Sequence, residues 1–209
     1  MPHMYECMDV VQPGAIQAST ITVVSGLPRS GTSMMMRMCK EGGLDLFADF
    51  IRKKDQRNPH GYFEFEKVKE QDSYSSWIKD ASGKTIKVIS RLLPQLPSSH
   101  FYKIIFLQRS LCEVLRSQAE MAAHESGEEW GKGDLEQLEK MYQLHLSETF
   151  AWLKDRPNMD VLVVPYEGVL SNPLGEAKRI STFLGSELDV TSMTLAVDES
   201  LNHAPSKKG

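Results

Sequence analysis

Short apolar runs recur along the chain and predict the strands of a buried sheet. They are rich in Val and Ile, and most lack the strict alternation of a half-exposed strand, which favours burial on both faces. These runs are Ile21–Ser25, Thr85–Ser90, Lys103–Gln108 and Val161–Pro165. Four strands of this kind indicate a sheet that lies in the interior of the protein.

Helix-like segments lie between and after these runs, at Thr32–Cys39, Glu64–Lys79, Leu111–Ala123, Leu135–Leu153 and Leu174–Leu184. Asp134 is a candidate N-cap for the longest segment, Asn172 with Pro173 marks a helix start, and Gly185 marks a helix stop. Strands that alternate with helices indicate βαβ units. We therefore predict a three-layer α/β fold, with a mainly parallel sheet flanked by helices.

Two segments, Asp45–Gly61 and Glu125–Gly133, lack clear periodicity and are predicted to be loops or lids over one end of the sheet. The length of 209 residues is typical of one domain. We expect a single domain over residues 1–209, with an N-terminal extension at 1–19 and a flexible tail at 205–209.

Composition narrows the classes of function. Hydrophobic residues make up 41% of the chain and charged residues 25%, which disfavours intrinsic disorder. The net charge of −4 argues against a general nucleic-acid binder, so no nucleic-acid partner is expected. Three cysteines without CxxC spacing indicate neither a disulfide scaffold nor a zinc site. No stretch approaches the ~20 apolar residues of a membrane helix, so we expect no membrane partner and a cytoplasmic location.

The segment from Ile21 to Ser33 carries the most information about chemistry. A buried strand leads through a glycine-containing turn directly into a helix, which directs several backbone N–H groups and the positive helix end toward one point. The residues expected around a bound phosphate are Pro28, Arg29, Ser30, Gly31, Thr32 and Ser33. The alternative is a glycine-rich turn after an ordinary strand, but the order of strand, turn and helix favours an anion site.

Gly26 and Gly31 have the spacing of a Walker loop, GxxxxGK[ST], but Thr32 stands where the lysine should be. That lysine reaches the β- and γ-phosphates, so its absence weakens an ATPase or GTPase assignment. GLPRSGTS instead resembles the 5′-phosphosulfate loop of the sulfotransferase superfamily, PK[ST]GT[TS], with Arg29 in place of the lysine. The resemblance implies a P-loop NTPase-like fold and adenosine 3′-phosphate 5′-phosphosulfate (PAPS) as the sulfonate donor, with no metal required.

A second strand, turn and helix runs from Lys103 to Ser117. It resembles the family's 3′-phosphate motif, in which an arginine at the strand end and a serine eight residues later hold the adenosine 3′-phosphate. Arg109 and Ser117 fall on those positions, and a guanidinium can grip phosphate through two hydrogen bonds. The alternative is that Arg109 pairs with Glu113 or with a surface carboxylate.

The segment Val161–Gly185 resembles the family's closing strand–helix unit, in which Tyr166 and Glu167 are expected to orient loops near the pocket. The resemblance extends over about Ile21–Ala204 and rests on two specific motifs and this supporting segment.

The resemblance also bears on the general base that accepts the acceptor's proton. One branch of the family uses a histidine in a KTHLP context, and the comparable segment Lys87–Pro94 lacks it. Asn58–Glu66 resembles the NPxGYxE segment of bacterial members, which makes Glu64 the first candidate for the base and His60 the second. The alternatives are a Glu64 that only stabilises the start of the predicted helix at 64–79 and a His60 that is an exposed loop residue.

These features together predict a sulfotransferase that moves a sulfonate group from PAPS to a hydroxyl or amine of a small molecule or glycan. Arg29 would stabilise charge at the transferring group. Two alternatives stay open: a P-loop phosphotransferase, or a catalytically silent domain that binds the nucleotide.

Overall fold

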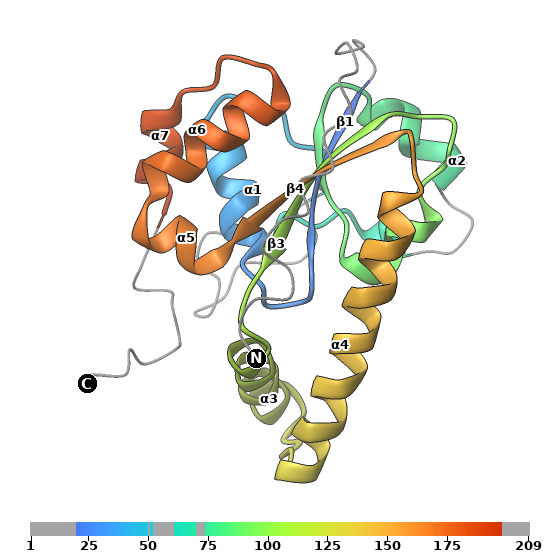
Figure 1. Cartoon of the computed structure of the whole chain (residues 1–209), viewed down its shortest axis with the longest axis vertical. Helices are drawn as coiled ribbons and strands as arrows, with labels where there is room; N and C mark the ends of the chain where they lie inside the picture. Colours follow the sequence, from blue (N-terminus) through green and yellow to red (C-terminus); the bar gives the residue numbers. More distant parts are fainter. Residues whose placement is uncertain (1–19, 50, 52–60, 70–73, 198–209) are drawn as a thin grey trace.

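The structure is a computed structural model and describes residues 20–49, 51, 61–69 and 74–197 (Figure 1). His60, the predicted extension at 1–19 and the predicted tail at 205–209 lie outside the described residues, as does most of the loop predicted at Asp45–Gly61.

Four parallel strands form the central sheet in the order β2-β1-β3-β4. The strands are β1 (Ile21–Gly26), β2 (Thr85–Lys87), β3 (Tyr102–Gln108) and β4 (Met159–Pro165). Because all four run in the same direction, their carboxyl ends meet at one edge of the sheet. The chain leaves β1 at that edge between β2 on one side and β3 on the other, the place where open α/β sheets bind ligands.

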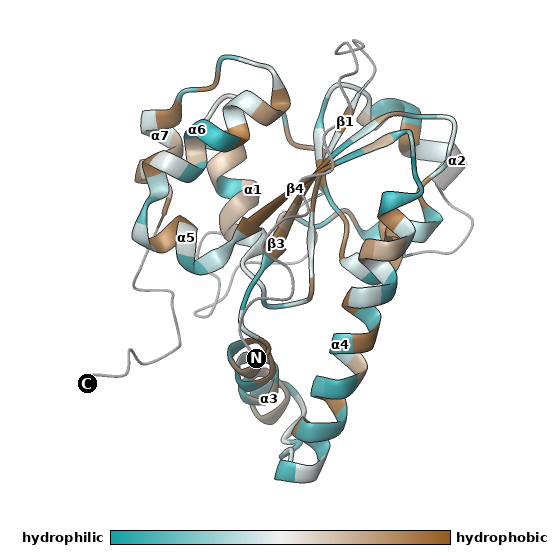
Figure 2. Cartoon of the chain, in the orientation of Figure 1, coloured by the Kyte–Doolittle hydropathy of each residue, from teal (hydrophilic) through white to brown (hydrophobic). Residues whose placement is uncertain are grey.

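Successive residues of each strand face opposite sides of the sheet and enter two separate cores. Val23, Ile104 and Val161 pack in one core, and their neighbours Val24, Ile105 and Leu162 pack in the other. Figure 2 shows the strands as a hydrophobic centre between more polar helices. Burial on both faces explains why these strands have continuous apolar sequences, and it confirms the predicted three-layer α/β fold.

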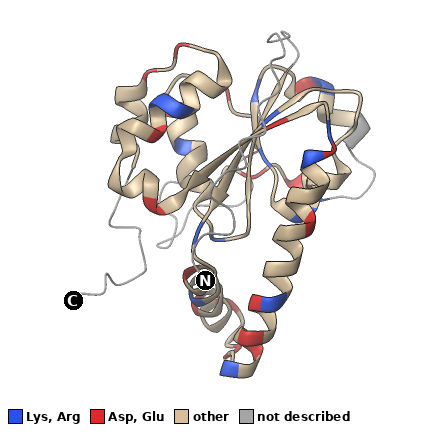
Figure 3. Cartoon of the chain, viewed as in Figure 1, with Lys and Arg blue, Asp and Glu red and all other residues tan. Residues whose placement is uncertain are grey.

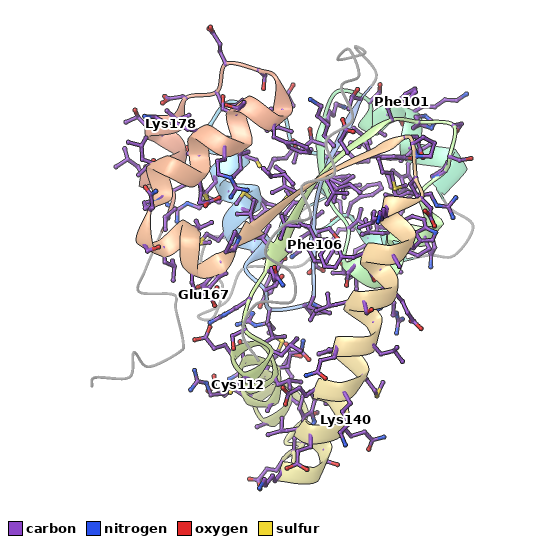
Figure 4. All side chains as sticks on the ribbon, viewed as in Figure 1. Phe101, Phe106, Cys112, Lys140, Glu167 and Lys178 are labelled. Carbon is purple, nitrogen blue, oxygen red and sulfur yellow. The ribbon has the colours of Figure 1, made fainter. Side chains whose placement is uncertain are left out.

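Four helices cover one face of the sheet (Figure 1): α1 (Thr32–Glu41), α5 (Tyr166–Ser171), α6 (Pro173–Leu184) and α7 (Val190–Leu195). The other face is covered by α2 (Tyr74–Trp77), α4 (Lys132–Lys154) and the 3₁₀ helices η2 (Ile78–Ala81) and η3 (Ser90–Gln95). Figure 4 shows Phe106 at the centre of the molecule, where its ring packs 4.8 Å from that of Phe150 in α4. Helix α3 (Leu111–Ser126) and the first half of α4 project beyond the sheet at its carboxyl edge (Figure 1).

The prediction of one helix over Glu64–Lys79 is wrong. The described residues form instead the short 3₁₀ helix η1 (Glu66–Lys69), followed by α2 and η2. Packing explains the break, because Phe65 and Trp77 both contact Phe47, at ring distances of 4.6 and 5.9 Å, and lie 5.2 Å from each other. This aromatic cluster overrides the local helical pattern.

Smaller differences occur at element ends. Strand β2 is three residues long rather than six, because the chain turns into η3 at Ser90. Asp134 is not the N-cap of α4: Gly131 is, and the Asp134 carboxylate accepts a 2.8 Å hydrogen bond from the Gly131 N–H from within the first turn. Asn172 does cap α6 through its side chain, and Gly185 ends that helix in a left-handed conformation, both as predicted.

Candidate active site

The turn after β1 needs glycine at both of its ends. Gly26 has φ = 144°, and a Cβ there would lie 2.5 Å from Ser30 Oγ and 2.6 Å from the Leu107 carbonyl oxygen. Gly31 has φ = 100°, and a Cβ there would lie 2.5 Å from the ring of Tyr166. The two glycines therefore allow the turn to fit against β3 and α5.

Arg29 lies at the middle of this turn with φ = 72°, an uncommon conformation for a residue with a side chain. Its Nε donates a 2.9 Å hydrogen bond to Oγ of Ser117, 88 positions later in the chain. Ser117 is buried in α3. The contact joins the turn after β1 to the helix after β3.

Arg109 follows β3 directly and lies beside the same turn. Its guanidinium donates to the backbone oxygen of Arg29 at 3.2 Å and to the Glu113 carboxylate at 3.0 Å. The side chain is only 7% exposed and lies over the ring of Tyr166, 4.2 Å from the centroid. Pairing with Glu113, the alternative raised by the sequence, is thus present, and the same side chain also contacts the turn.

Tyr166 contacts both the turn after β1 and the segment after β3, since its ring lies against Gly31 and under Arg109. Burial raises the pKa of the Tyr166 phenol, against the opposing effect of the Arg109 charge. Glu167 lies at the same edge of the sheet, and its carboxylate is 3.5 Å from the backbone nitrogen of Ser110. Figure 4 labels Glu167 at the start of α5 and Cys112 at the start of α3. These contacts fit the orienting role expected of Tyr166 and Glu167.

The turn also contains a buried hydroxyl with no hydrogen-bond partner among the described residues, Ser30 Oγ. Thr32, the first residue of α1, is buried as well. An unsatisfied buried hydroxyl costs about 1–3 kcal/mol, and a phosphate or sulfonate oxygen would satisfy it. Together with the cationic Arg29, this hydroxyl fits an anionic group such as the 5′-phosphosulfate of PAPS.

The sequence analysis named Lys87 only as the start of the segment compared with KTHLP and gave it no role, but the structure places it next to the turn. Its Nζ donates to Ser33 Oγ at 3.1 Å and to the Tyr62 carbonyl oxygen at 3.0 Å, and the side chain is only 8% exposed. The available signal was its position at the end of β2, because β2 pairs with β1 and both strands end at the same edge.

Glu64 lies next to Lys87. Its carboxylate oxygens are 3.5 Å from Lys87 Nζ and 2.9 Å from Lys69 Nζ, and the side chain is 16% exposed. Partial burial lowers the pKa of the Lys69 ammonium, but its hydrogen bonds to Glu64 and Glu66 outweigh this effect and raise the pKa. Glu64 precedes η1 and is not part of a long helix, so the helix that would have given it a purely stabilising role does not exist.

Within the described part of the chain, no group of three or more His, Cys, Asp or Glu side chains is placed to hold a metal ion. In the same residues, no helix is both long enough and apolar enough to cross a membrane.

The fold has relatives among solved structures. The sulfotransferase STF1 from Mycobacterium tuberculosis matches with a TM-score of 0.59 and 15% identity over 87% of this chain and 72% of that one. Mouse sulfotransferase SULT7A1, solved in complex with PAP, matches with a TM-score of 0.56 and 15% identity over 89% and 67%. Retinol dehydratase in complex with androsterone and the inactive cofactor PAP matches with a TM-score of 0.50 and 18% identity over 87% and 64%. A search of curated proteins finds no significant match.

A family model also matches the sequence itself. The model is that of the sulfotransferase family, and it matches residues 54–190. This range includes Glu64, Arg109 and Ser117, whereas the turn after β1 precedes it. The match covers more than half of the chain, and the chain therefore belongs to the sulfotransferase family.

Proposed function

We propose that this protein transfers a sulfonate group from PAPS to a hydroxyl or amine of a small-molecule or glycan acceptor. The observation that carries the proposal is the convergence of Arg29, Arg109 and Ser117 at the carboxyl edge of the sheet. Two guanidinium groups and a buried serine meet there beside a turn that contains an unsatisfied hydroxyl. The PAP complexes of two solved relatives support the choice of donor.

The donor would bind across two adjacent turns. The backbone of residues 28–33, with the hydroxyls of Ser30, Thr32 and Ser33, would hold the 5′-phosphosulfate. Arg109 and Ser117 would hold the 3′-phosphate. Ser117 Oγ accepts its hydrogen bond from Arg29, so its own hydroxyl proton is available for a phosphate oxygen.

In the reaction, the acceptor oxygen or nitrogen forms a bond to sulfur while the bond between sulfur and the phosphate oxygen breaks. Negative charge develops on the departing phosphate, which leaves as 3′-phosphoadenosine 5′-phosphate (PAP). Arg29 would stabilise this charge from the turn, and Lys87 would do so from the end of β2, where it already contacts Ser33.

The acceptor loses a proton in the same reaction, and we propose Glu64 as the group that receives it. Glu64 is largely buried and its carboxylate lies 3.5 Å from Lys87 Nζ, which itself reaches the turn. The ion pairs with the ammonium groups of Lys69 and Lys87 hold the carboxylate in place. His60, the second candidate from the sequence, lies outside the described residues.

Two other functions would use the same turn. A phosphotransferase would normally need a lysine at position 32 and a carboxylate that binds Mg²⁺, and Thr32 occupies that position. A silent domain would bind PAP without turnover. Protection against heat by ATP or GTP but not by PAP would indicate the first function, and binding of PAP without transfer to any acceptor would indicate the second.

The test of the donor site is calorimetry with PAP and with 5′-AMP, which lacks the 3′-phosphate. We expect PAP to bind well above 5′-AMP, and Arg109→Ala to weaken PAP binding by about 1.5–3 kcal/mol because charged hydrogen bonds are lost. The affinity for 5′-AMP should fall less in this variant, because only the contact of Arg109 with the turn is lost there. Arg179→Ala, which removes an arginine from α6, is the matched control. Equal affinities of the unaltered protein for the two nucleotides would contradict the proposed 3′-phosphate site.

A further inference from the structure

We propose that Ser90 and His145 bind the hydroxyl of the acceptor, with Nδ1 of His145 donating a hydrogen bond to the acceptor oxygen, and that the acceptor is an uncharged hydroxyl compound with an apolar body. This inference rests on the proposed sulfonate transfer and adds to it the residues and the substrate class of the acceptor side.

The two residues come from distant parts of the chain. Ser90 begins η3 and is only 1% exposed, and its Oγ lies 2.8 Å from Nε2 of His145 in α4. Thr149, one turn further along α4, lies 3.5 Å from the same nitrogen. A buried serine hydroxyl must donate its proton, and the lone pair of Nε2 is the acceptor at hydrogen-bond distance. With Ser90 as the donor, the ring proton is on Nδ1, which has no hydrogen-bond partner among the described residues.

Two chains of contacts connect His145 to the proposed donor site. On one side, Ser90 follows Lys87 by three residues, and Lys87 contacts Ser33. An extended chain advances about 3.3 Å per residue, so Ser90 lies within about 10 Å of Lys87 along the backbone.

On the other side, the contacts run through α3. Tyr142, which shares a face of α4 with His145, donates a 2.8 Å hydrogen bond to Gln118, and Gln118 donates a 2.8 Å hydrogen bond to the carbonyl oxygen of Pro28. Pro28 belongs to the turn after β1. His145 is therefore connected to the turn after β1 in two ways: through Ser90 and the nearby Lys87 to Ser33, and through the neighbouring Tyr142 and Gln118 to Pro28.

The imidazole of His145 is suited to an uncharged ligand. Burial lowers its pKa, and the nearby charges of Glu148 on α4 and Arg91 on η3 act in opposite directions. The ring is neutral at pH 7, so it offers a hydrogen bond without a charge that would favour an anion.

The surroundings of the pair point to the same class of acceptor. Ile89 precedes Ser90, Tyr142 lies one helical turn before His145, and both are partly buried apolar side chains packed against the core. The body of an acceptor bound at the pair would contact the parts of these side chains that the core does not cover. Residues 120–140, at the projecting ends of α3 and α4, contain seven acidic and two basic side chains. Figure 3 shows charged residues gathered where these two helices meet. This negative region would disfavour an acceptor that extends a negative charge toward the ends of these helices.

The test uses the full chain saturated with PAP, and 4-methylphenol and 4-hydroxybenzoate as a neutral and an anionic probe. Titrations followed by the imidazole signals of His145, assigned with the His145→Gln variant, should show the Nδ1–H form and a shift on addition of 4-methylphenol. We expect 4-hydroxybenzoate to bind at least about tenfold more weakly, a factor that corresponds to about 1.4 kcal/mol.

Three variants separate hydrogen bonding to the acceptor from a structural role. The amide nitrogen of asparagine can take the place of Nδ1, whereas the amide of glutamine takes the place of Nε2 and keeps the contact with Ser90. We expect His145→Asn to bind 4-methylphenol within about threefold of the unaltered protein, and His145→Gln and His145→Ala to lose about tenfold or more. PAP affinity should stay the same in all three.

Several outcomes would overturn the inference. Retained phenol binding in His145→Gln but not in His145→Asn would show that His145 acts only through Ser90. An unshifted imidazole signal on addition of 4-methylphenol would contradict the proposed acceptor site, and so would 4-hydroxybenzoate binding as tightly as 4-methylphenol. Normal PAP binding in the same experiments would still support the donor site. If PAP itself does not bind, the proposed function fails and this inference fails with it.

Discussion

The donor side and the acceptor side of the candidate active site are built in different ways. On the donor side, the functional residues lie in the turns and helices that follow two strands: Arg29 in the turn after β1, Arg109 just after β3, and Ser117 in the helix that follows it. On the acceptor side, Glu64 precedes a short 3₁₀ helix, and His145 lies in the middle of the 23-residue helix α4.

This difference has a physical consequence. Adjacent parallel strands bring their ends together whatever the rest of the chain does, so the donor residues meet because the sheet forms. Ser90 and His145 meet only because η3 and α4 pack on the same face of the sheet. The donor side should therefore be common to proteins of this fold, whereas the acceptor side can vary with its loops and helices.

The largest effect is expected at Glu64, on the acceptor side. A positioned base is worth roughly 10²–10⁴-fold in rate, so Glu64→Gln should lower kcat by that factor while PAP affinity and Tm change little. Turnover of labelled PAPS with a screen of phenols, sugars and amines measures the first quantity, and calorimetry and thermal melting measure the others.

Glu66→Gln is the matched control, because Glu66 also pairs with Lys69 but is more exposed. Comparable losses in both variants would show that the ion pairs with Lys69, and not proton transfer, matter for the rate. An active Glu64→Gln with an inactive His60→Ala would instead assign the base to the second candidate.

The next largest effect is expected at Arg29 on the donor side. Removal of one positioned donor to a developing charge costs roughly 10²–10³-fold in kcat, and Arg29→Ala should lose about that much while PAP affinity falls far less. Arg29→Lys should keep much of the activity if positive charge is what the turn needs, and Arg179→Ala should behave like the unaltered protein. A Lys variant that binds PAP but has no turnover would show that the planar guanidinium is required, for instance for its bond to Ser117.

The same difference between the two sides explains what the sequence could predict. The strands, the turn at 26–33 and the position of Arg109 and Ser117 beside that turn could be predicted, because each lies within one local strand–turn–helix unit; their role toward a 3′-phosphate stays a prediction. The contact between Ser90 and His145 spans 55 positions and depends on tertiary packing, for which the sequence has no local signal. The helix predicted at Glu64–Lys79 failed for a related reason, since contacts of Phe65 and Trp77 with the distant Phe47 decide the local structure.

The smallest effect is expected at Tyr142, whose hydroxyl connects the two sides through Gln118. Tyr142→Phe removes one partly buried hydrogen bond, so the free energy of unfolding should fall by about 0.5–1.5 kcal/mol. Because α4 would then be held less firmly against the phosphate-binding turn, binding of 4-methylphenol to the PAP complex should weaken severalfold, with PAP affinity unchanged.

Tyr102→Phe gives a control for stability, because it also removes one tyrosine hydrogen bond, a 2.9 Å contact with the Pro97 carbonyl oxygen at the opposite edge of the sheet. Denaturant unfolding should show similar losses of stability in the two variants, and only Tyr142→Phe should affect the phenol. If both variants weaken phenol binding equally, the effect comes from general destabilisation, and the two sides of the site are not coupled through Gln118. If neither variant weakens phenol binding, the position of α4 is fixed by its apolar contacts with the sheet, chiefly those of Leu146, Phe150 and Leu153. The hydrogen bonds from Tyr142 through Gln118 would then contribute only to stability.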